Sequence, residues 1–165
     1  FVKELLTDGK CDIAFLRSES SSVKEFNSIP YMIDYLTAVL PATHPLAKAD
    51  NLPFEQLRGE TFLLFPEHSF INDLCIRECR NAGFEPHIAY TGNRGATLID
   101  LVRNGAGITL MMHHSARQEN DSSLAFIPVT PGIYSYISLN YAKEKPLSPQ
   151  AESFVRYVKA HKRDF

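Results

Sequence analysis

An excess of charge of either sign is missing from this sequence. Its 165 residues include 17 lysines and arginines and 19 aspartates and glutamates, which gives a formal net charge of −2. A domain that binds nucleic acid through the phosphate backbone usually carries a basic excess on one face. We therefore do not expect this chain to bind DNA or RNA by itself.

Cysteine is scarce, with only Cys11, Cys75 and Cys79. An odd number without the regular spacing of a disulfide framework argues against a small secreted scaffold held by disulfides. Cys75 and Cys79 lie four residues apart on the apolar stripe of a predicted helix. We expect both to be buried structural residues, because free cysteine usually behaves as a small apolar side chain.

Long apolar runs are also missing. The longest uncharged stretch, residues 122–142, is long enough to cross a bilayer, but Pro128, Pro131 and Gly132 interrupt its apolar residues. No basic segment followed by an apolar run opens the chain, so we expect no secretory signal. The sequence begins with Phe1 inside a helical pattern, which indicates a fragment of a longer protein.

Hydrophobic residues make up 44% and charged residues 22% of the chain, as in an ordinary globular domain. Periodicity and capping signals predict helices at 1–8, near Pro53, at 69–82, at 96–105 and after Ser148. Strands are predicted at 11–16, 26–41, 61–65, 87–90, 107–112, 125–129 and 133–142. Because strands and helices alternate from 11 to 129, the fold class is α/β, with a parallel sheet flanked by helices.

Motifs of catalysis and cofactor binding are lacking. Gly105 and Gly107 close a helix and open a strand, whereas a dinucleotide fingerprint follows a strand and opens a helix. His113 and His114 are adjacent at a predicted strand end, so their side chains would point to opposite faces and not share a metal. There is no phosphate-binding loop and no nucleophile elbow. Nothing favours an enzyme, and we expect no cofactor and no metal.

Three loops follow predicted parallel strands at their carboxyl ends, where open α/β sheets bind ligands. "RSES" contains Arg17, which can pair an anion through two N–H groups. "PEHSF" and "TGNRG" each lead into a helix N-terminus, whose free N–H groups favour a carboxylate or phosphate. Each loop alone is typical of a solvated connection. Together they favour a small anionic ligand.

Six segments occur in the order "ELLTDGKCDIAF", "ATHPLA", "LPFEQLRGETFLLF", "LIDLVRNGAGITLMM", "FIPV" and "LSPQAESFVRYV". In this order and spacing they resemble the effector-binding domain of LysR-type transcriptional regulators over nearly the whole chain. "FLR" and "LLFPEHSF" look most like regulators of aromatic-compound catabolism. The resemblance implies a regulatory domain of a bacterial transcription factor that binds a small organic effector, carboxylate or aromatic-derived.

The resemblance also implies two Rossmann-like subdomains joined by crossover strands, as in type 2 periplasmic binding proteins, with the effector between them. Residues 1–40 and 133–165 would form subdomain I, and 41–132 subdomain II. Subdomain I would be incomplete, because the strand, helix and strand that open the family's domain are absent. The implied effector contacts are Arg17, Ser18, Pro66, Glu67, His68, Ser69, Phe70, Ile71, Asn93, Arg94 and Gly95.

The implied partners are a small-molecule effector and further copies of the chain, as a homodimer or tetramer formed by helices 1–8 and 69–82. DNA would bind only through an absent N-terminal helix-turn-helix, and the protein would be cytoplasmic without membrane contact. Two alternatives are a periplasmic solute-binding protein and an α/β enzyme. The sequence upstream of Phe1 distinguishes the three.

Overall fold

The computed structural model describes residues 2–116 and 121–161. The chain folds into two compact units. The first comprises Phe1–Asp34 and Tyr134–Phe165, and the second Tyr35–Ile133. Along the chain the elements are α1 (Val2–Thr7), β1 (Ile13–Ser18), β2 (Phe26–Pro41), η1 (Pro45–Lys48), β3 (Leu52–Pro53), η2 (Phe54–Leu57), β4 (Thr61–Leu64), α2 (Phe70–Asn81), β5 (His87–Thr91), α3 (Gly95–Arg103), β6 (Thr109–Met112), α4 (His113–Ala116), β7 (Leu124–Thr130), β8 (Tyr134–Ala142) and α5 (Pro149–Ala160).

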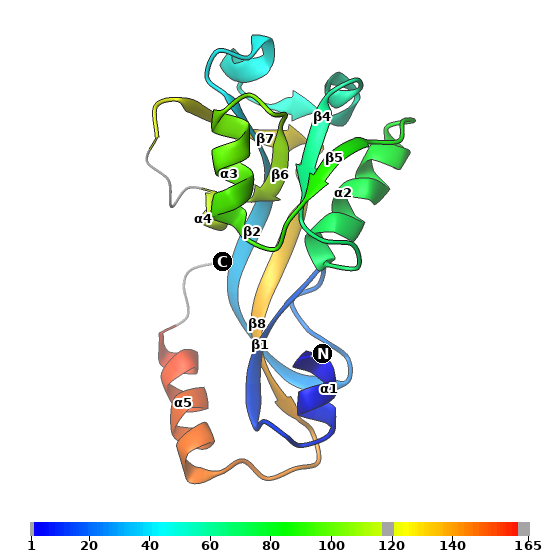
Figure 1. Cartoon of the computed structure of the whole chain (residues 1–165). Helices are drawn as coiled ribbons and strands as arrows, with labels where there is room; N and C mark the ends of the chain where they lie inside the picture. The colour runs from blue at the N-terminus through cyan, green and yellow to red at the C-terminus, as the bar shows by residue number, and fades with distance from the viewer. Residues whose placement is uncertain (1, 117–120, 162–165) are drawn as a thin grey trace. The chain divides into compact units, whose positions relative to one another are not determined.

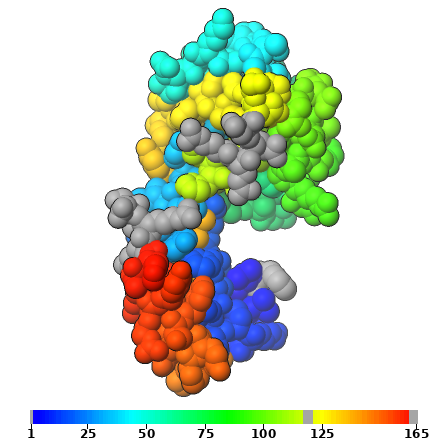
Figure 2. Space-filling model, turned by 90° about the vertical axis from the view of Figure 1, so that its left-hand side faces the viewer, coloured from blue at the N-terminus to red at the C-terminus, as the bar shows by residue number. Residues whose placement is uncertain are grey.

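The first unit packs α1 and α5 against a small sheet. β1 pairs with β8 in antiparallel register, Leu16 opposite Ser138, and β8 also borders β2. Ser148 begins α5 by accepting a hydrogen bond from the Ala151 main chain, with proline at the next position, as predicted. Figure 2 shows α5 as a red and orange ridge on the surface of this unit.

The predicted strand at 11–16 lies two residues too early. β1 starts at Ile13 and continues through Arg17 and Ser18, which were expected in a loop. Tertiary pairing extends the strand, because Arg17 lies opposite Ile137 and Ser18 opposite Tyr136 of β8, about 120 residues away in the sequence.

The first unit leaves aromatic side chains open to solvent. Phe15 and Phe154 are each 42% exposed. Their rings pack edge to face with centroids 6.4 Å apart, and the ring centroids of Phe15 and Tyr31 are 5.3 Å apart.

The second unit places α2 and α3 on opposite faces of a parallel group of strands (Figure 1). β4 pairs in parallel with β5, and a parallel bridge from Phe62 to Ile108 brings β6 beside β4. Leu110 and Met112 pack on the α2 side of β6, and Met111 packs on the α3 side. This alternation makes every residue of β6 buried.

A glycine is required where β6 approaches β4. Gly107 has φ +154°, and a Cβ atom there would lie 2.4 Å from the main-chain oxygen of Thr61. Any side chain would therefore displace the start of β6.

The expectation of a parallel sheet does not hold for the strands around β2. β2 runs antiparallel to both β6 and β7, with Leu36 opposite Met112 and Ala38 opposite Ile127. Hydrophobic periodicity identifies strands but carries no information on the direction of their partners, which explains the error. α4 was not predicted at all.

Candidate functional site

The carboxyl ends of β4 and β5 lie at the same edge of the second unit (Figure 1). Their parallel pairing dictates this, and a hydrogen bond from the Gly92 main-chain N–H to the Leu64 carbonyl, 3.0 Å long, extends the pairing beyond the strands. The predicted site segments Pro66–Ile71 and Asn93–Gly95 leave from this edge. The structure therefore brings these two of the three predicted segments to one place.

The segment after β4 is a tight turn into α2. The Ser69 N–H donates to the Pro66 carbonyl at 3.2 Å, and the Ser69 hydroxyl accepts from the Asn72 N–H at 3.3 Å. His68 has φ +63°, an uncommon conformation for a residue other than glycine. Glu67 and His68 are exposed. Their side chains and the Ser69 hydroxyl are the polar groups that this turn offers to a ligand.

Phe70 and Ile71 differ from the rest of that segment, because both pack partly against the apolar core of the second unit. They anchor the first turn of α2. Their predicted role as effector contacts is left untested by this packing, since both stay partly exposed.

The segment after β5 begins α3. Arg94 occupies the N-cap position, is exposed and makes no side-chain capping bond. The Arg94 side chain therefore does not cap the first N–H groups of α3. A Cβ atom at Gly95 would lie 3.3 Å from Met111 Cε and 3.7 Å from Phe65 Cζ, so this turn packs closely on the ends of β4 and β6.

Arg17 and Ser18 belong to the first unit. The Arg17 guanidinium donates to the Ser135 hydroxyl at 2.5 Å and to the Asp34 carboxylate at 3.1 Å. The Ser18 hydroxyl donates to the Ser20 carbonyl at 2.7 Å. A guanidinium carries five N–H donors. These two bonds use two of the five N–H groups of Arg17, and Asp34 balances its charge.

Sequence reasoning missed polar and aromatic residues near the end of β6. His113, the first residue of α4, stacks on Tyr35 with ring centroids 4.3 Å apart, and its Nδ1 lies 3.5 Å from the Thr37 hydroxyl. The histidines had been considered only as metal ligands. The position of His113 directly after a parallel strand was the signal that could have identified it.

Asn72 was missed as well. It is 1% exposed, and its side-chain amide donates to the Phe65 carbonyl at 2.8 Å. A buried polar residue within an apolar stripe was the available signal, since such a group needs hydrogen-bond partners.

The two helical cysteines are buried, as predicted. Burial raises the pKa of the Cys75 thiol well above its usual range and the pKa of Cys79 to about 12. Both thiols are therefore protonated at neutral pH and poor nucleophiles. Among the described residues, no three His, Cys, Asp or Glu side chains are grouped as metal ligands would be. No helix in that part of the chain combines the length and apolarity needed to cross a membrane.

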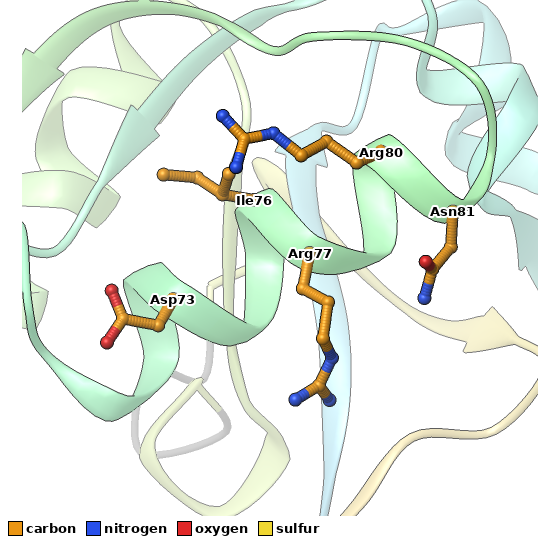
Figure 3. Close-up of a pocket in the computed structure, with 5 residues that line it drawn as sticks. All are labelled: Asp73, Ile76, Arg77, Arg80 and Asn81. Atoms are coloured by element: carbon orange, nitrogen blue, oxygen red, sulfur yellow. The ribbon is translucent and has the colours of Figure 1, made fainter.

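The outer face of α2 carries a shallow hollow of about 390 Å³ (Figure 3). Its lining residues all project from this one helix: Asp73, Ile76, Arg77, Arg80 and Asn81. Arg80 is held by an ion pair with Glu85 at 2.7 Å. With a floor formed by one helix, the hollow is a helix surface suited to a protein contact rather than an enclosed ligand pocket.

The chain is similar in sequence to known transcriptional regulators. The transcriptional dual regulator GltC of Bacillus subtilis is 26% identical over 159 residues, 96% of this chain and 53% of GltC. The HTH-type transcriptional regulator CatR of Pseudomonas putida is 32% identical over 126 residues, 75% of this chain and 43% of CatR. The chain thus spans about half the length of the curated relatives it matches.

Among solved structures, the regulatory domain of Synechocystis CcmR in complex with 2-PG superimposes with a TM-score of 0.87 at 16% identity, covering 99% of this chain and 79% of that one. The fold is that of the regulatory domains, the type 2 periplasmic-binding-protein fold expected from the sequence. The family model of the LysR substrate binding domain matches residues 1–163. The chain therefore belongs to the LysR substrate-binding domain family.

Proposed function

We propose that this chain senses a small organic acid, bound at the edge where α2 and α3 begin. The observation that carries the proposal is the convergence of two helix N-termini after neighbouring parallel strands, with Ser69 and Arg94 beside them. Helix N-termini attract carboxylate and phosphate through free N–H groups and the helix dipole. The family consists of regulator domains rather than enzymes, so the binding event is proposed as a signal and not as the start of a reaction.

The proposed contacts follow the sequence expectation. In the second unit these contacts are Pro66–Ile71 and Asn93–Gly95, and in the first unit Arg17 and Ser18 stay proposed contacts. We further propose that the two compact units correspond to the two regulatory subdomains, with the boundary in β2 at Asp34 rather than after Leu40.

In the longer protein, we propose that effector binding controls the transcription of target genes. CatR is named as an HTH-type regulator, and the relatives extend well beyond the part that this chain matches. DNA would be bound by such a helix-turn-helix and not by this chain, whose net charge is −2. A protein with this role acts in the cytoplasm, where the DNA lies.

We also propose a homodimer or tetramer that uses α1 and the outer face of α2. Ile76 is the reason for choosing α2, because it is a partly exposed apolar side chain in the hollow between Arg77, Arg80 and Asp73. An apolar centre with a charged rim is the usual pattern of a protein interface.

Thermal-shift measurements with matched acids and amides test the ligand class. Benzoate and succinate would each be compared with benzamide and succinamide, which keep the shape and remove the charge. The proposal expects at least one acid to raise the melting temperature of the chain while its amide does not. Equal effects of acid and amide would contradict it.

A further inference from the structure

Asn72 makes contacts that an ordinary residue of a helix core does not make. It lies in the first turn of α2 and is 1% exposed, next to the apolar residues Leu74 and Cys75. A buried amide is costly unless its hydrogen bonds are formed, and an apolar side chain of similar size would fill the same space without that cost. The amide therefore points to a requirement beyond packing.

Asn72 forms hydrogen bonds with residues at both ends of the turn that precedes α2. Its main-chain N–H donates to the Ser69 hydroxyl at 3.3 Å, and its side-chain Nδ2 donates to the Phe65 carbonyl at 2.8 Å. The first bond fixes the end of the turn and the second fixes its beginning. The turn itself contains His68 in a left-handed conformation, φ +63°. Fixed ends keep this strained turn in one geometry.

Phe65 connects this turn to the start of α3. Its ring packs partly against the core on the α3 side of the strands, beside Leu63, Leu98 and Met111. Its Cζ atom is 3.7 Å from the position that a Cβ atom would occupy at Gly95, the first residue of α3. Phe65 thus accepts a hydrogen bond from α2 through its carbonyl, and its ring lies close to the first residue of α3.

We propose that Asn72 is a positioning residue of the acid site: by holding Phe65 it sets the spacing between the N-termini of α2 and α3. This inference rests on the proposed function, because the spacing matters for binding only if one ligand contacts both N-termini. Sites whose supporting residues are loosened by about 1 Å lose much of their affinity even when every direct contact residue is present.

Three variants of the full chain separate positioning from packing. Asn72→Leu removes the polar group, and Asn72→Asp removes the donor at nearly constant shape. Asn72→Gln keeps an amide donor on a side chain one carbon longer. Asn81→Leu and Asn81→Asp are matched controls, because Asn81 is the same residue type at the other end of the same helix, where its amide donates to the Glu78 carboxylate.

Calorimetric titration with benzoate and succinate gives the first readout. For the acid that binds the wild-type chain, we expect roughly tenfold weaker binding in the Leu and Asp variants of Asn72, as for a site whose supporting residues are loosened. The Gln variant should bind more tightly than the Leu variant, and the Asn81 controls should bind as the wild type does. A Gln variant no better than the Leu variant would overturn the inference.

The backbone amide resonances of Gly95 and Ala96 give a second readout that needs no ligand. They should shift in Asn72→Asp and stay in place in Asn81→Asp, because only Asn72 is connected to α3 through Phe65. If neither acid binds the wild-type chain, the proposed function loses its support, while these resonances still decide the role of Asn72. Unchanged resonances of Gly95 and Ala96 in folded Asn72 variants would show that Asn72 does not position α3. If the Asp variant does not fold, the Gln and Leu variants provide the same comparison.

Discussion

The Arg17 guanidinium donates from Nη2 to Oδ2 of Asp34 across 3.1 Å, and the Asp34 side chain is completely buried. A carboxylate in that position needs a partner, since a buried charge left alone is strongly unfavourable. Arg17 thus stabilises its own unit, whether or not it also contacts an effector. Any loss of effector binding on mutating Arg17 has to be separated from a loss of folding.

Replacing Arg17 with alanine should therefore destabilise the chain. We expect Arg17→Ala to lower the free energy of unfolding by about 3 kcal/mol, because the buried Asp34 carboxylate then loses the guanidinium that balances its charge. Adding Asp34→Asn should restore part of the loss. Urea denaturation measures both effects, with Arg156→Ala on the exposed side of α5 as the control. A loss no larger than that of the control would show that the ion pair contributes little.

Removing the cap of α2 should weaken acid binding as well as stability. Ser69→Ala is expected to lower the free energy of unfolding by about 1 kcal/mol, as for other N-cap serines. It should also weaken binding of the acid about tenfold, the size of one hydrogen bond to a charged group.

Ser148→Ala is the matched control for this experiment, because Ser148 caps α5 in the first unit by the same kind of bond. It should cost at least as much stability, because the Ser148 hydroxyl also donates to the Asp12 carboxylate at 2.7 Å, and it should leave the affinity unchanged. Equal affinity losses in both variants would indicate a general effect of instability rather than a contact by Ser69.

The buried cysteines should resist oxidation. Burial raises the pKa of Cys75 well above its usual range and that of Cys79 to about 12, so the reactive thiolate is scarce at neutral pH. Mass spectrometry after peroxide treatment should find both thiols intact in the native chain and modified in urea. Modification of the native thiols at the rate seen in urea would instead favour a redox sensor.

A charge at the centre of the α2 hollow should weaken self-association. Ile76→Glu places a carboxylate where an interface needs an apolar residue, and burying an unpaired charge is unfavourable. Sedimentation velocity should show a shift of the variant toward monomer. Tyr157→Glu, on the exposed side of α5, is the control and should associate like the wild type. An unchanged Ile76→Glu profile would place the interface elsewhere.

Local signals explain what the sequence could predict. α2 was predicted to within one residue at each end, because Ser69 provides a cap and Leu74, Cys75 and Cys79 mark one face. These signals act within a few residues along the chain. They also located the two turns at the carboxyl ends of β4 and β5.

Long-range pairing explains what the sequence could not predict. Arg17 and Ser18 lie in a strand because of partners in β8, and Asp34 engages Arg17 from 17 residues away. The closeness of the Phe65 ring to Gly95 depends likewise on the parallel pairing of β4 and β5. Polarity alone suggested a loop at Arg17, and nothing in the local pattern indicated Asp34 as its partner.

The most direct test of an acid site at the α2–α3 edge is a nitrogen–proton NMR titration of the chain with benzoate and succinate. The account predicts that at least one acid shifts the amide resonances of residues 67–71 and 93–96 more than any others, and that its neutral amide leaves them in place. Shifts confined to other residues, or equal shifts with acid and amide, would contradict the account.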